Sequence, residues 1–76
     1  MPVRLNGSVV RLLRHRLHLT QQELATMLGG YQPYVSDLER GVYVHVYPAT
    51  LAALAQALGV AMEDLIMEEG RQWTRP

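Results

Sequence analysis

The stretch TQQELATMLGG, residues 20–30, constrains the fold more than any other part of the sequence. Thr20 and Glu23 have the spacing of a capping box, in which the threonine side chain accepts from the Glu23 backbone N–H and the glutamate reaches back to the Thr20 N–H. Leu19 and Leu24 flank this box as a hydrophobic staple. Gly29 ends the helix, since glycine adopts the left-handed conformation at no steric cost. The stretch therefore predicts a short helix that is followed at once by a turn.

Apolar residues recur every three or four positions through most of the chain, and no alternating strand pattern recurs at sheet-like intervals. The first helix is expected to begin near Ser8, a good N-cap, and to stop by His18. Its apolar face is predicted to consist of Val9, Leu12, Leu13 and Leu17.

Three further helices follow the one that begins at Thr20. The first of them has Pro33 in its first turn and ends at Gly41, the next spans residues 48–58, and the last spans residues 62–69. Their expected inward positions are Val35 and Leu38, then Leu51, Leu54, Ala55 and Leu58, then Leu65 and Ile66. We therefore predict an all-α fold of five helices.

The chain has 76 residues and no cysteine, which indicates one domain held by apolar packing without disulfides. We expect this domain to span residues 1–70 and residues 71–76, with Trp73, to form a frayed tail. No segment resembles a secretion signal or a membrane span, so we expect a soluble, cytoplasmic protein with no membrane association.

The formal net charge is zero, but the charges are unevenly distributed along the chain. Residues 1–20 carry four arginines and no acidic residue, whereas residues 61–70 carry four acidic residues and no basic one. Local sign matters more than the total for the choice of partner.

Two short helices joined by a glycine turn, the second with polar outward residues, form a helix-turn-helix, which lays its second helix in the DNA major groove. The segment TQQELATMLGGYQPYVSDLERG, followed by TLAALAQALGV and MEDLI, resembles the lambda-repressor-like, or xenobiotic-response-element, family over residues 8–67. The resemblance implies a DNA-binding transcription regulator, of repressor type, that binds a near-palindromic operator as a homodimer. It implies no cofactor.

The resemblance also implies roles for individual residues. Gln21 would anchor a phosphate and brace the reading helix. Gln32 is the expected base reader, because its amide can pair with adenine N6 and N7, whereas Pro33 could only offer an apolar contact to a thymine methyl. The expected phosphate or groove-wall contacts are Tyr31, Tyr34 and Ser36, with Tyr43 and His45 against the backbone of the same half-site.

Charged residues around the expected reading helix divide into three groups. Asp37 stands where the family often has a hydrogen-bond donor, and a carboxylate at this position could only accept, for example from cytosine N4. Arg14 and Glu39 match a pair that usually forms a partly buried salt bridge in this family. The arginines expected to be freer for phosphate are Arg11, Arg16 and Arg40.

Three positions besides Asp37 depart from the family pattern. Gly30 replaces a small apolar residue, Tyr31 replaces Ser or Thr, and Ala61 stands where a Ser cap is common. We therefore expect weaker turn packing and weaker capping.

The run VYVHVY, residues 42–47, supports two interpretations. Its alternation could form a dimer strand or a backbone clamp, or its valines could simply cover the core while the aromatic residues stay on the surface.

Other classes of function are disfavoured by the same residues. His15 and His18 have the spacing of a metal pair but lack further ligands, so no metal site is expected. Tyr43, His45 and Asp37 offer no nucleophile with a paired base, so an enzyme is not expected. The alternative function is a protein-interaction module of the same fold, such as an antitoxin with a toxin or other protein partner. Neutrality, Asp37 and the acidic residues 63–69 favour that alternative.

Overall fold

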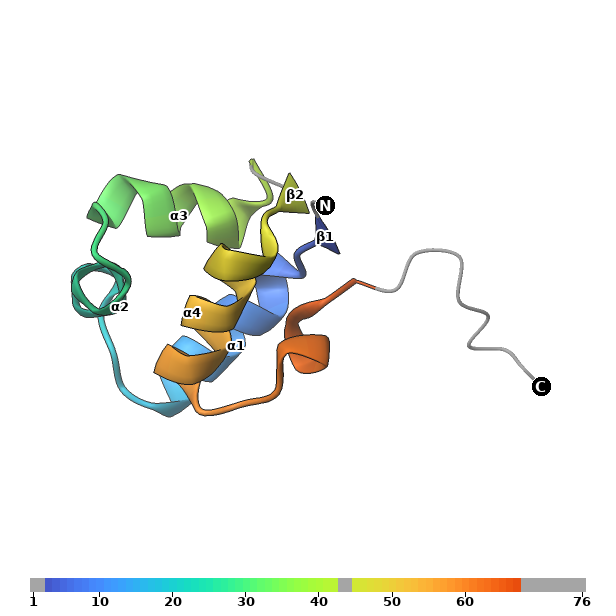
Figure 1. The fold of residues 1–76 in the computed structure, drawn as a ribbon. Helices are drawn as coiled ribbons and strands as arrows, with labels where there is room; N and C mark the ends of the chain where they lie inside the picture. The colour runs from blue at the N-terminus through green and yellow to red at the C-terminus, as the bar shows by residue number, and fades with distance from the viewer. Residues whose placement is uncertain (1–2, 43–44, 68–76) are drawn as a thin grey trace.

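The computed structural model describes residues 3–42 and 45–67, and in this part of the chain four α-helices enclose the core. In chain order the elements are β1 (Val3–Arg4), α1 (Gly7–Arg16), α2 (Gln21–Leu28), α3 (Gln32–Arg40), β2 (His45–Val46), α4 (Pro48–Leu58) and the 3-10 helix η1 (Met62–Leu65). Figure 1 shows α3 along one edge of the molecule, with α2 beside its N-terminal end and α1 and α4 beneath it. The predicted tail at 71–76 lies outside the described residues.

The start of α1 differs from the prediction. Asn6 is the N-cap, because its side chain accepts a hydrogen bond from the Val9 backbone N–H at 3.3 Å, and Ser8 lies inside the first turn. The end agrees with the prediction, since α1 stops at Arg16 and His18 has a left-handed φ of 57°.

The buried face of α1 was also predicted wrongly in part. Leu12 and Leu17 are 56% and 48% exposed, whereas Val10 is fully buried. The buried residues of α1 are Gly7, Val10 and Arg14, which lie on one side of a helix at i, i+3 and i+7. Hydrophobic periodicity missed this side because a glycine and an arginine occupy two of its three positions.

The predicted start and end of α2 are confirmed. Thr20 accepts from the Glu23 backbone N–H at 3.0 Å and donates its own backbone N–H to the Glu23 carboxylate at 2.8 Å. Gly29 is left-handed, with φ of 72°, and ends α2. The core positions predicted for α3 and α4 are all buried: Val35, Leu38, Leu51, Leu54, Ala55 and Leu58.

The predicted fifth α-helix is not formed by residues 62–67, the part of it that the structure describes. Its place is taken by η1, a single 3-10 turn of four residues. Leu65 is fully buried as expected, but Ile66 is extended and forms an isolated β-bridge with Leu5. A backbone hydrogen bond from Asn6 N–H to Leu65 O at 2.8 Å also ties this segment to the start of α1. Pairing with the N-terminal segment therefore replaces helical hydrogen bonds here.

A small antiparallel sheet was not predicted. In it Val3 pairs with Val46 and Arg4 with His45, so the end of the VYVHVY run joins the N-terminus of the same chain. Val46 is buried and His45 exposed, which places this valine over the core as the simpler interpretation held. Val42 is 58% exposed, so the valines do not all lie on the core side. Tyr43 and Val44 lie outside the described residues.

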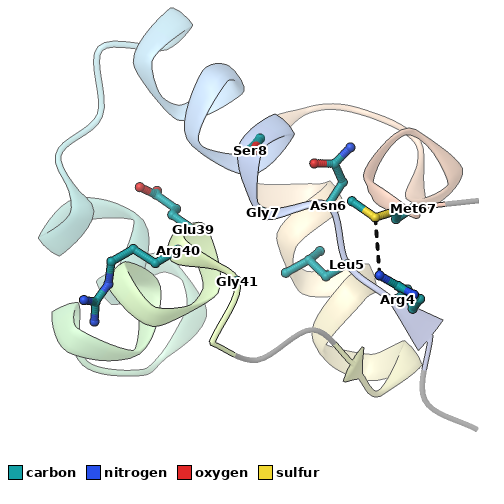
Figure 2. A pocket seen from close by; sticks show the side chains of 9 residues that line it. All are labelled: Arg4, Leu5, Asn6, Gly7, Ser8, Glu39, Arg40, Gly41 and Met67. Carbon is teal, nitrogen blue, oxygen red and sulfur yellow. Dashed lines mark hydrogen bonds between the residues drawn. The ribbon is translucent and has the colours of Figure 1, made fainter. Parts of the chain in front are cut away.

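The start of α1 packs closely against the end of α3. A Cβ built on Gly7 would stand 2.2 Å from the Leu38 carbonyl oxygen and 3.0 Å from the Glu39 carbonyl oxygen. Figure 2 shows Gly7 at the start of α1, near the end of α3. Glycine at this position therefore allows α1 to approach α3, and this approach fixes where α3 lies.

Candidate nucleic-acid interface

The outward side of α3 carries most of the predicted DNA contacts. They occur at i, i+1, i+4, i+5 and i+8, so one side of the helix presents Gln32, Pro33, Ser36, Asp37 and Arg40. Pro33 and Arg40 are exposed, and the other three are half-buried. Val35 and Leu38 on the opposite side are fully buried, which holds the helix in place.

Gln32 is held by a chain of hydrogen bonds that begins inside the protein. Its Nε2 donates to Gln21 Oε1 at 2.5 Å, and Gln21 Nε2 donates to Glu39 Oε1 at 3.1 Å. These two hydrogen bonds thus join the start of α2 to both ends of α3. Gln21 was expected to brace the reading helix, and its hydrogen bonds to Gln32 and Glu39 are the contacts through which it would do so.

Glu39 is also paired with Arg14 in the buried ion pair that the sequence predicted. The guanidinium donates from Nε to Glu39 Oε2 at 2.6 Å and from Nη2 to Glu39 Oε1 at 3.1 Å. Arg14 Nη1 donates to the Leu19 carbonyl at 2.7 Å, so the same side chain fixes the loop before α2. The two side chains are only 9% and 2% exposed. The contact between Gln21 and Glu39 was not predicted, because no spacing rule links residues on two different helices.

Asp37 and Arg40 form a second ion pair on the surface of α3, with 2.6 Å between Arg40 Nη2 and Asp37 Oδ1. Arg40 was expected to be freer than this. The guanidinium is still 67% exposed, so solvent screens the pair and it contributes little to stability. The pair places a positive group beside the only carboxylate on the outward side of α3.

The predicted aromatic contacts lie in different surroundings. Tyr31 is 80% exposed at the N-cap of α3, where it makes no side-chain capping bond, so the weak cap is confirmed. Tyr34 packs partly against the core, which limits its ring as a contact. His45 is exposed on β2, and Tyr43 lies outside the described residues.

A hollow of about 240 Å³ lies between α1 and α3, beside the chain of hydrogen bonds. Its lining is Arg11, Arg14, Gln21, Ser36, Glu39 and Arg40. Arg11 and Arg40 are exposed, so two cations stand at this hollow next to the outward side of α3. This composition suits an anionic oxygen, such as a phosphate of a nucleic-acid backbone.

A second hollow, of about 160 Å³, lies where the start of α1 meets the end of α3 (Figure 2). Arg4 donates to Met67 Sδ at 3.7 Å here, and Figure 2 shows the Arg4 and Arg40 guanidinium groups pointing away from each other. The two arginines therefore do not converge on one anion at this place.

Residues 3–42 and 45–67 contain no group of three or more His, Asp or Glu side chains that could hold a metal ion. No helix of this part is long and apolar enough to cross a membrane.

A helix held at one edge of a small helical core, following a glycine turn and presenting a braced amide, defines the helix-turn-helix class of DNA-binding domain. The chain belongs to the helix-turn-helix domain family, whose model matches residues 7–66. A Sinorhizobium fredii protein named "uncharacterized HTH-type transcriptional regulator y4dJ" is 43% identical over 63 residues, covering 83% of this chain and 80% of its own.

Solved structures place the fold among the lambda-repressor-like regulators, as the sequence suggested. The P22 c2 repressor in complex with a synthetic operator matches with a TM-score of 0.75 and 28% identity, over 83% of this chain and 94% of its own. The restriction-modification controller C.AhdI from Aeromonas hydrophila matches with a TM-score of 0.71 and 33% identity, over 79% and 86%.

The same fold also occurs inside an enzyme. Hydroxypropylphosphonic acid epoxidase from S. wedmorenis matches with a TM-score of 0.71 but 21% identity, and only 32% of its chain is covered. This likeness concerns the fold alone.

Proposed function

We propose that this protein is a sequence-specific DNA-binding transcription regulator of repressor type. In this proposal α3 enters the major groove, Gln32 reads an adenine, and Pro33 and Asp37 face neighbouring base edges. Tyr31, Tyr34, Ser36, Tyr43 and His45 contact the backbone or groove wall, with Arg11, Gln21 and Arg40 at phosphates.

The observation that carries the proposal is the braced Gln32 amide on the outward side of α3. One Nε2 hydrogen is used by Gln21, which leaves Oε1 and the second N–H of Gln32 for a partner. These are the acceptor and the donor that a bidentate pair with adenine N6 and N7 requires. The internal bond therefore does not compete with base readout.

The arrangement of charge supports the same side as the interface. Arg11 and Arg40 stand at the hollow between α1 and α3, whereas Glu63 and Asp64 are on η1. Figure 1 shows η1 at the far side of the molecule from the α2–α3 turn. A duplex lying along α3 would thus meet cations first, despite a net charge of zero.

We propose that two copies bind together. One domain of this size makes few base contacts, and two domains related by a twofold axis would read half-sites about one helical turn apart, or a multiple of it. The operator would then be a near-palindrome.

The rival function is a protein-interaction module of the same fold, which the neutral charge and Asp37 favour. Salt dependence separates the two functions. Two arginines per protomer at phosphates, Arg11 and Arg40, would give a slope of log affinity against log salt of about −4 for a dimer. The measurement is a titration of labelled duplex DNA with the full chain across a salt series. A steep negative slope supports DNA binding, and a flat response or no binding supports the rival.

A further inference from the structure

The buried ion pair and the reading amide are parts of one connected set of hydrogen bonds. Glu39 accepts from Arg14 and from Gln21, and Gln21 in turn accepts from Gln32. Each member can therefore constrain the next. The ion pair joins α1 to α3, and its carboxylate is also the last acceptor in this series of hydrogen bonds.

The Glu39 carboxylate determines which atoms donate and which accept in these hydrogen bonds. An ionised carboxylate can only accept hydrogen bonds, so the Gln21 atom that faces Glu39 must be the amide nitrogen. The Gln21 oxygen is then the atom that faces Gln32, so Gln32 must present its own nitrogen to it. Glu39, at 2% side-chain exposure, accepts two hydrogen bonds from the Arg14 guanidinium and one from Gln21, and this arrangement keeps the order fixed.

We propose that Glu39 is a positioning residue that sets which way round the Gln32 amide faces the DNA. The proposal rests on the proposed function and adds an origin for its base preference. While the Glu39 carboxylate accepts from Gln21, the Gln32 amide always presents its oxygen and its free N–H on the same sides. This arrangement pairs with adenine in one orientation. With an amide in place of the carboxylate, Gln21 and Gln32 can both turn over, and the order of donor and acceptor is no longer fixed.

The test compares two substitutions that both weaken the ion pair. Glu39→Gln removes the acceptor-only group, whereas Arg14→Lys keeps the carboxylate and the opposite charge but loses the bidentate contact. The operator is first selected from a random DNA pool, and affinities of the full-length variants are then measured for every single-base change in it.

We expect Glu39→Gln to reduce discrimination at one base pair per half-site by about five-fold or more, because a bidentate amide–adenine pair discriminates by at least that factor. Discrimination at other positions should stay as in the unaltered protein. Arg14→Lys should lower the melting temperature but leave discrimination at all positions unchanged.

Two further variants keep the test decisive if Glu39→Gln does not fold. Arg14→Gln with Glu39→Gln leaves no stranded charge and should relax the same base pair. Gln21→Ala leaves the ion pair intact and should relax it too, because Gln21 is the contact through which Glu39 acts on Gln32.

Unchanged discrimination in folded Glu39→Gln and in the neutral double variant would overturn the proposal, as would equal relaxation in Arg14→Lys. If the unaltered protein showed no base preference at any position, the proposed function itself would fail, which is a separate result.

Discussion

Gly7 is the residue whose lack of a side chain matters most for the site. The first turn of α1 lies directly against the carbonyl groups at the end of α3, where a Cβ would be 2.2 Å from the Leu38 oxygen. This close contact and the Arg14–Glu39 ion pair together set the position of α3 relative to α1. Gly30 lies in the turn before α3 but is in a different situation, since a Cβ there would be 3.7 Å from the Tyr34 ring.

These two glycines give a matched prediction. Gly7→Ala should lower the free energy of unfolding by about 1–3 kcal/mol, because a backbone oxygen occupies the space that the methyl group needs. Gly30→Ala should leave stability unchanged or raise it by about 0.4–1 kcal/mol, because its φ is not left-handed and alanine restricts the unfolded chain. Urea unfolding followed by circular dichroism measures both. Equal losses would show that the α1–α3 contact is not as close as described.

Single residues show how far local sequence rules reach. The capping box of Thr20 and Glu23 and the stop at Gly29 were predictable because each depends on residues within one turn. The cap of α1 was assigned to Ser8 instead of Asn6, since both are good caps two positions apart and propensity does not separate them. The ion pair of Arg14 and Glu39 came from family resemblance, because no local rule joins residues 25 positions apart.

At the scale of elements, α3 is well packed along its length but weakly capped at its start. Its N-cap, Tyr31, has an extended backbone with ψ of 150° and makes no side-chain capping bond. A serine hydroxyl at this position could accept from the backbone N–H of Tyr34, which donates to the Tyr31 carbonyl at 3.0 Å, whereas Pro33 has no N–H. The sequence has thus kept a large exposed ring where a stabilising cap would fit.

We predict that Tyr31→Ser raises stability by about 1 kcal/mol relative to Tyr31→Ala, or roughly 4–8 °C in melting temperature. Both variants lose the ring, so their difference isolates the cap. If the ring contacts the DNA backbone as proposed, both should bind DNA more weakly than the unaltered protein and to a similar extent. Melting curves and duplex titrations test the two statements separately, and a serine variant no more stable than the alanine variant would refute the first.

Elements that depend on distant partners were the ones the sequence did not predict. The β1–β2 pair and the Leu5–Ile66 bridge join residues more than 40 positions apart, and each strand has only two residues. The acidic residues that start at Glu63 suggested a helix because acids suit a helix N-terminus. The extended Ile66 ends it after one turn, since its partner Leu5 lies at the other end of the chain.

At the scale of the whole molecule, the α1–α3 contact, the buried ion pair and the braced amide all act on one surface. Packing of α1 and α2 against α3 holds it at an edge, and the hydrogen bonds from Glu39 to Gln32 hold its reading side chain. Asp37 on this surface is paired with Arg40, and the carboxylates of Glu63 and Asp64 lie away from it on η1. We therefore expect separate roles for Gln32, whose amide reads a base, and Arg11, whose guanidinium holds a phosphate.

Whether α3 reads DNA through this amide is tested by the affinities of Gln32→Ala and Arg11→Ala for the selected operator and for all its single-base variants. Gln32→Ala should cost about 1–3 kcal/mol on the operator and remove the preference at one base pair per half-site. Arg11→Ala should weaken binding to all sequences by the same factor and make the salt slope shallower. Equal losses on every base variant for Gln32→Ala would contradict the claim that α3 reads DNA through this amide.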